Sequence, residues 1–177
     1  PAIAQTPVGN EADLRTAFAD ANETAIVLTT DIDLTCLGGG ALVRNSAADL
    51  TIDGAGHLLD QTCAGERVMT VSGDGTLTID DLGVTGGTTG DSGGAISSTG
   101  SVVVTGGAVF NGNSAGDRGG AISATSVTVS DGSLFTANTA GNDGGAIYAA
   151  FGVSVSDATL TANSAGGNGG AAMVSSG

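Results

Sequence analysis

The sequence contains no lysine, and its fixed positive charge comes from four arginines, Arg15, Arg44, Arg67 and Arg118. The chain also carries 18 acidic residues, so its formal net charge is -14. Such a surface repels phosphate backbones and anionic lipids, which argues against a protein that binds nucleic acid or membrane surfaces. Cations or basic partners are better candidates, although acidic charge also serves simply to keep a protein soluble.

Long apolar runs and aromatic residues are scarce as well. No stretch approaches the roughly 20 apolar residues of a membrane span, so we expect this chain not to insert into a membrane. Aromatic residues make up 3% of the chain and tryptophan is absent, which argues against a groove that stacks sugar rings. There is no nucleophile, phosphate-loop or zinc-binding motif, and His57 is the only histidine.

Glycine is abundant, with 32 residues against 2 prolines. A chain so rich in small residues is a candidate for disorder, yet 40% of its residues are hydrophobic and the aliphatic ones recur at regular intervals. A solenoid accounts for both features. Small residues fill its tight turns, and each coil buries a few aliphatic side chains against its neighbours.

The chain repeats itself. Gly-Gly-Ala begins at Gly93, Gly119, Gly144 and Gly169, with steps of 26, 25 and 25 residues. Within each repeat, short runs of alternating aliphatic residues are separated by glycine, asparagine, aspartate and serine, which is typical of strands joined by tight turns. This pattern predicts an all-β fold, a single-stranded right-handed parallel β-helix of about six coils of about 25 residues each.

We divide the chain into an N-terminal segment with a short capping α-helix (1–24), early coils (25–92) and regular repeat coils (93–177) that end in an open or truncated C-terminus. Asn10 is an N-cap residue for the helix. The helix is expected to cover the first coil with one apolar face, formed by Leu14, Ala17, Phe18 and Ala21.

Equivalent residues of successive coils should lie above one another. We expect one turn to hold an internal ladder of side-chain amides, formed by Asn113, Asn138 and Asn163. A stack in the core beside it is expected from Phe110, Phe135 and Leu160. These residues are interpreted as structural.

The two cysteines, Cys36 and Cys63, lie 27 residues apart, which is one coil step. On neighbouring coils their Cα atoms should be about 5 Å apart, within disulfide range. A disulfide there would contribute about 3 kcal/mol and would indicate an oxidising compartment. A pair of buried reduced thiols is the alternative.

Five aspartates could hold a cation: Asp53, Asp80, Asp81, Asp131 and Asp157. Asp53 and Asp80 are one coil step apart, and two stacked carboxylates would raise one pKa or attract a cation. Weak Ca²⁺ binding is one hypothesis, and solvated turn residues are the other. No arginine or lysine for proton abstraction lies at a nearby repeat position, so we assign no catalytic residue, no cofactor and no firm metal site.

Tyr148 and Phe151 are the aromatic residues outside the repeat core and the N-terminal cap. The earlier repeats have Ser97 and Ser123 in place of Tyr148. This local departure from a uniform repeat makes the two aromatic residues our candidates for contact with a partner.

The paired motifs Gly-Gly-Ala-Ile (93–96, 119–122) and Phe-x-x-Asn (110–113, 135–138) resemble the repeats of the polymorphic outer membrane protein family. Members of that family are bacterial autotransporter passengers, β-helical and adhesive. The segments 11–34 and 50–63 look like the cap and first coils of secreted pectate-lyase-like proteins. The resemblance implies surface exposure and adhesion, and it carries over no catalytic residue.

We therefore expect a non-catalytic module, secreted or on the cell surface after removal of a signal peptide, that serves adhesion or surface display. Its partner would be a host cell, a glycan or another surface ligand, or copies of itself stacked end to end. Two alternatives stay open. One is a structural subunit of an extracellular filament or layer, and the other is a lyase or hydrolase acting on polysaccharides, or a fragment of one.

Overall fold

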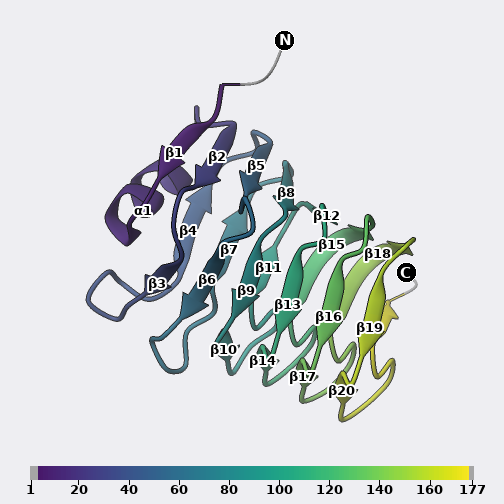
Figure 1. Cartoon of the computed structure of the whole chain (residues 1–177). Helices are drawn as coiled ribbons and strands as arrows, with labels where there is room; N and C mark the ends of the chain where they lie inside the picture. Colours follow the sequence, from purple (N-terminus) through teal and green to yellow (C-terminus); the bar gives the residue numbers. More distant parts are fainter. Residues whose placement is uncertain (1–3, 176–177) are drawn as a thin grey trace.

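Short runs of alternating residues form the strands, because every second side chain points into the core. In β12 (Ser101–Thr105), Val102 and Val104 are buried while the residues between and beside them are partly exposed. The computed structural model describes residues 4–175 and stacks such strands into a parallel β-solenoid of about six turns with one short helix (Figure 1). The predicted fold class is confirmed.

Three sheets make up the walls of the solenoid, and every strand pairing in them is parallel. The six-stranded sheet contains β3 (Ile32–Leu34), β6 (Leu58–Gln61), β9 (Gly83–Thr85), β13 (Val109–Asn111), β16 (Leu134–Thr136) and β19 (Thr159–Thr161). The four-stranded sheet contains β10 (Thr88–Thr89), β14 (Ser114–Ala115), β17 (Thr139–Ala140) and β20 (Ser164–Ala165).

The eleven-stranded sheet consists of two rows of strands that merge toward the C-terminal end of the rod. One row contains β1 (Thr6–Val8), β2 (Ala25–Leu28), β5 (Leu50–Asp53), β8 (Thr76–Asp80) and β12. The other contains β4 (Leu42–Asn45), β7 (Met69–Ser72) and β11 (Ile96–Ser98). The long strands β15 (Ile122–Val129) and β18 (Ile147–Val155) continue both rows, and β21 (Ala172–Val174) pairs with β18.

The Gly-Gly-Ala motif forms a corner of each coil, and its first two positions accept only glycine. Its first glycine has a positive φ, 75° at Gly93 and 61° at Gly119, which side chains disfavour. At the second glycine, a Cβ on Gly94 would collide with the carbonyl oxygen of Gly120 in the next coil. The motif therefore recurs because it sets both the turn and the close approach of successive coils.

The interior is one continuous apolar core that extends from Val8 to Ala149. Phe110 and Phe135 stack in it with ring centroids 4.8 Å apart and nearly parallel planes. Leu160 pairs with Phe135 in the next coil, as the repeat predicts. The hydrogen-bonded coils and the filled core together make the rod a firm support for side chains on its outer faces.

Helix α1 (Glu11–Ala19) covers the first coil at one end of the rod (Figure 1). Asn10 caps it by accepting a hydrogen bond from the amide of Asp13, and Leu14, Ala17 and Phe18 are buried as predicted. Ala21 is exposed and lies beyond the helix, so its assignment to the apolar face was wrong. The cause is the early end of the helix at Ala19. No helix within residues 4–175 is long and apolar enough to cross a membrane.

Candidate functional site

A groove of about 360 Å³ lies on the outer face of the six-stranded sheet, across β6, β9 and β13. Its floor is formed by Leu58, Gly83 and Val109, which are direct neighbours in the strand register. Gly83 has no side chain between these two aliphatic ones, and the Leu58 side chain leans over it. Gly83 does not adopt a positive φ, so its backbone conformation would also accept a larger residue.

Polar residues lie at both ends of the strands that form this floor. Thr85 and Asn111 line the groove at the carboxyl ends of β9 and β13, and Asp60 is the register neighbour of Thr85. His57 and Asp81 line it at the opposite end, where the chain turns into the sheet. The groove is therefore apolar along its floor and polar at its two rims.

Asp31 holds the turn beside the groove. Its Oδ1 accepts a hydrogen bond from the amide of Leu58 at 2.9 Å and lies 3.2 Å from Nδ1 of His57. These two contacts lower the pKa of the exposed Asp31 carboxyl, the backbone amide having the larger effect. Asp31 is thus charged at neutral pH, and it anchors the only histidine of the chain at the groove.

All four arginines lie away from the groove and have other partners. Arg15 pairs with Glu11, and Arg67 lies 3.8 Å from Asp91. The guanidinium of Arg118 lies 3.8 Å from Asp117 and 3.9 Å from Asp143. Arg44 is buried. Within residues 4–175, no arginine forms an ion pair with the aspartates around the groove, Asp31, Asp33, Asp60 and Asp81. These carboxylates therefore place negative charge without an arginine partner beside an apolar surface.

The aspartates singled out from the sequence lie at or just after the carboxyl ends of β5, β8, β15 and β18, and Asp81 among them lines the groove. Asp53 and Asp80 are register neighbours, as their spacing predicts. Burial raises the pKa of Asp80, and the negative charges of Asp53, Asp81 and Asp131 raise it further. Asp131 differs, because hydrogen bonds from Thr105 and then Ser130 lower its pKa.

Backbone geometry explains why three of these aspartates recur at the same corner of their coils. Asp81, Asp131 and Asp157 have φ values of 45°, 54° and 47°, and Gly106 at the equivalent corner has 64°. Aspartate and glycine are among the few residues that adopt this left-handed conformation readily. Within the part of the chain that the structure describes, no three histidine, cysteine or acidic side chains converge enough to hold a metal ion. Weak Ca²⁺ binding at these residues stays a prediction.

The asparagine ladder is present at the turn after the six-stranded sheet. The side chain of Asn138 donates to Oδ1 of Asn163 at 3.0 Å and to the carbonyl oxygen of Phe110 at 3.0 Å. Its own Oδ1 accepts from the backbone and side chain of Asn113 at 3.0 and 3.1 Å. The ladder thus satisfies main-chain groups that the turn would otherwise leave buried without partners.

The predicted disulfide joins Cys36 to Cys63, with the two Cα atoms 4.9 Å apart. Next to it, the backbone and hydroxyl of Thr62 donate to the carbonyl oxygen of Leu34, so hydrogen bonds tie the same two coils together. Gln61, which the sequence did not single out, is buried beside the disulfide and accepts from the amide of Cys63.

The predicted contact residues Tyr148 and Phe151 both lie in β18. The Arg118 guanidinium lies 4.9 Å from the centre of the Tyr148 ring and donates to its hydroxyl at 3.2 Å. Phe151 is 77% exposed, where the register between β15 and β18 shifts by one residue. Their role in partner contact stays a prediction.

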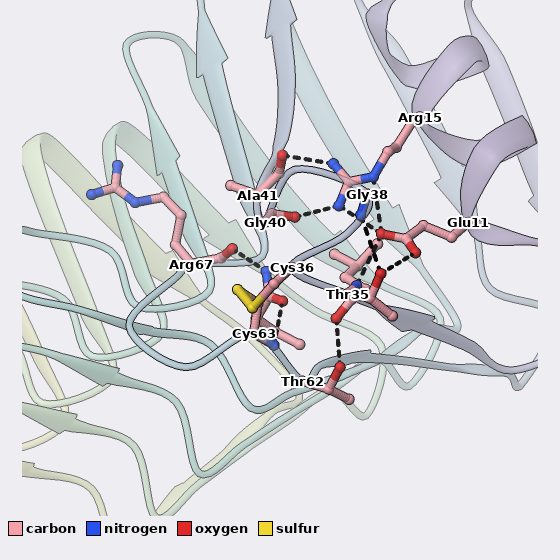
Figure 2. Close-up of polar contacts among 12 residues, drawn as sticks. Glu11, Arg15, Thr35, Cys36, Gly38, Gly40, Ala41, Thr62, Cys63 and Arg67 are labelled. Carbon is pink, nitrogen blue, oxygen red and sulfur yellow. Dashed lines mark hydrogen bonds and ion pairs between the residues drawn. A yellow bond between two sulfur atoms is a disulfide. The ribbon is translucent and has the colours of Figure 1, made fainter.

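The attachment of α1 to the first coils escaped sequence reasoning. Figure 2 shows Arg15 between the Glu11 carboxylate and the carbonyl oxygens of Gly40 and Ala41. Thr35 donates to Glu11 from its amide at 2.9 Å and its hydroxyl at 2.8 Å. Burial alone would raise the pKa of Glu11, but hydrogen bonds from Thr35 and Arg15 outweigh it, and the pKa is lowered.

The groove also escaped sequence reasoning, although a signal for it exists. In β6, β9 and β13, the first residue of the strand points outward and the second is buried. The outward residue is aliphatic in β6 and β13 but glycine in β9. An outward aliphatic column with a gap in the middle predicts a hollow once the register is known.

Comparison with known families adds to this geometry. A family model described as "Putative pectate lyase-like adhesive domain" matches residues 5–165. The chain belongs to this family. Neither the curated proteins nor the solved structures contain a match to the chain. The adhesive family and the disulfide together indicate an extracellular or cell-surface protein.

Proposed function

We propose that this adhesive domain is a non-catalytic module that binds a ligand on another surface through the outer face of its six-stranded sheet. The observation that carries the proposal is the groove across β6, β9 and β13, an exposed hollow on a firm sheet. Leu58 on its floor is 38% exposed, and contact with a partner would remove that aliphatic surface from water. Membership of an adhesive family supports the same function.

The solenoid suits this role mechanically. Its coils are joined by parallel ladders along the rod and its core is continuous, so a ligand at the groove meets a preformed surface. The Gly-Gly-Ala-Ile and Phe-x-x-Asn repeats, which resemble those of polymorphic outer membrane proteins, favour display on a cell surface over free secretion.

Adhesion is tested with beads that carry the purified chain, applied to cultured cells and to immobilised neutral, acidic and amino-sugar glycans. We expect the beads to be retained on at least one of these surfaces, with the surface polymer unchanged in length. Beads carrying the Gly83→Leu variant, in which the groove is filled, are the matched control and should be retained less.

Other outcomes contradict the proposal. Shortening of pectin or alginate chains by the wild type but not by Asp80→Asn would establish a polysaccharide-active enzyme. Ordered polymers of the free chain in electron micrographs, with no retention of beads on any surface, would establish a structural subunit of a filament or layer.

A further inference from the structure

The shape of the groove limits what can occupy it. The groove passes over Gly83 and is bounded by Leu58 and Val109 in the adjacent strands. A Cβ on Gly83 would come within 2.9 Å of Cδ1 of Leu58, so the Leu58 side chain leans over Gly83 and supplies apolar surface at this position. An occupant therefore needs a hydrocarbon part that packs on these aliphatic neighbours.

The charge around the groove limits the occupant further. Asp81 lines one rim, and Asp60, with Asp33 as its register neighbour, lies beyond the other. No arginine within residues 4–175 neutralises these carboxylates, and the whole chain has a formal net charge of -14. Acidic polysaccharides and phosphates are repelled by such a field, whereas cations are attracted.

A metal ion does not match this arrangement. Asp81 precedes Thr85, the register neighbour of Asp60, by four residues, so the two rims are up to about 13 Å apart along the strands. A Ca²⁺ ion needs several oxygens at about 2.4 Å from one centre. The cation that fits is instead an organic one, with an aliphatic part that covers the apolar floor between the rims. Lysine and arginine side chains combine a charged end with a long aliphatic stem.

We propose that the groove binds an extended lysine- or arginine-rich segment of a partner protein. One basic side chain lies in the groove with its aliphatic stem against Leu58 and Val109, and other basic groups of the segment meet Asp81 at one rim and Asp60 beyond the other. The basic segment comes from outside these 177 residues, because they contain no lysine and their arginines are engaged elsewhere. This inference rests on the proposed adhesive function and names its ligand.

The test measures binding of a fluorescent oligolysine peptide to the full chain by anisotropy, at low and at physiological salt. We expect saturable binding that weakens with salt. The fully acetylated peptide, which keeps the stems without the charges, and oligoglutamate should not bind. Gly83→Leu should weaken binding about tenfold by filling the hollow, with the carboxylates unchanged.

A charge-matched pair of double variants separates the groove from the overall acidity of the chain. Asp60→Asn/Asp81→Asn should weaken binding about tenfold, whereas Asp74→Asn/Asp157→Asn, which removes the same charge from exposed turns elsewhere, should change it less than about twofold. Circular dichroism should show all variants folded. Equal losses in both double variants, or unchanged binding by Gly83→Leu, would overturn the proposal.

The two proposals fail separately. Retention of wild-type beads on cells or glycans, with no oligolysine binding, would leave adhesion standing and refute the basic ligand. Absence of bead retention together with groove-dependent oligolysine binding would refute adhesion and leave the basic ligand standing.

Discussion

The buried guanidinium of Arg44 donates a hydrogen bond to the carbonyl oxygen of Phe18 in the last turn of α1, at 3.1 Å. It also donates to the carbonyl oxygens of Asp20 at 2.7 Å and Glu23 at 2.9 Å. Carbonyl groups at the end of a helix lack partners within the helix, and the helix dipole places negative potential there. A side chain from β4 thus completes the end of the helix that covers the first coil.

Replacement of Arg44 by methionine keeps much of the side-chain volume but leaves the carbonyl oxygens of Phe18 and Glu23 without their donor. We expect a loss of about 2–4 kcal/mol in the free energy of unfolding, because hydrogen bonds from a charged group are removed in a buried place. Urea unfolding followed by circular dichroism measures it. Arg118→Met removes an arginine whose side chain is 45% exposed and should change stability by less than about 0.5 kcal/mol. Similar losses in the two variants would contradict the assigned role.

The disulfide should stabilise α1 as well as the coils that it joins. Cys36 lies in the loop whose Thr35, Gly40 and Ala41 bind Glu11 and Arg15 of the helix (Figure 2). The Cys36→Ser/Cys63→Ser variant should lose about 3 kcal/mol of stability.

Hydrogen exchange of that variant locates the effect. Amides of α1 should exchange faster than in the wild type, while the later coils, 120–150, should keep most of their protection under native conditions. A uniform increase along the rod would mean that the disulfide acts only on global stability.

The asparagine ladder gives a third prediction. In Asn138→Leu, the amide of Asn113 and the carbonyl oxygen of Phe110 lose buried hydrogen bonds. We expect a loss of about 3 kcal/mol, since each unsatisfied buried group costs about 1–3 kcal/mol. Thermal unfolding measures it, with Asn111→Leu as the control because the side chain of Asn111 is exposed. A loss at Asn138 no larger than at Asn111 would show that the ladder contributes little.

Repeated features could be predicted from the sequence because a solenoid converts spacing into contact. The step of 27 residues placed Cys36 beside Cys63 and Asp53 beside Asp80, and the later steps aligned the asparagines. Such positions need no knowledge of the rest of the fold, since each coil repeats the path of the previous one.

Features that depend on two different parts of the fold could not be predicted in this way. Arg44 was counted only as one of four basic residues, because its partners are main-chain carbonyls of a helix end that no repeat encodes. The groove depends on the absence of a side chain at Gly83 on an outward face, which becomes visible only when β6, β9 and β13 are in register.

Asp80 gives the fourth prediction, which concerns pH. Burial first, and then repulsion from Asp53, Asp81 and Asp131, raise the pKa of its carboxyl above the usual 3.8. The folded chain therefore holds this proton more tightly than the unfolded chain does. Proton binding at Asp80 therefore stabilises the fold. This stabilisation is fully present below the usual pKa and is lost as the pH rises through the raised pKa. At neutral pH, ionised Asp80 consequently destabilises the fold.

Asp80→Asn removes this charge and keeps the shape of the side chain. We expect it to be more stable than the wild type at pH 7, by up to about 1 kcal/mol for a side chain near the surface. The difference should shrink as the pH falls through the raised pKa and should vanish below the usual value of 3.8, because the wild-type carboxyl is then protonated in both states. Asp117→Asn should behave oppositely, since hydrogen bonds from Asn142 and Ser92 lower the pKa of Asp117 and its stabilisation is present at neutral pH. Urea unfolding of the three proteins across this range measures both signs, and a stabilisation by Asp80→Asn that stays constant with pH would contradict the assigned repulsion.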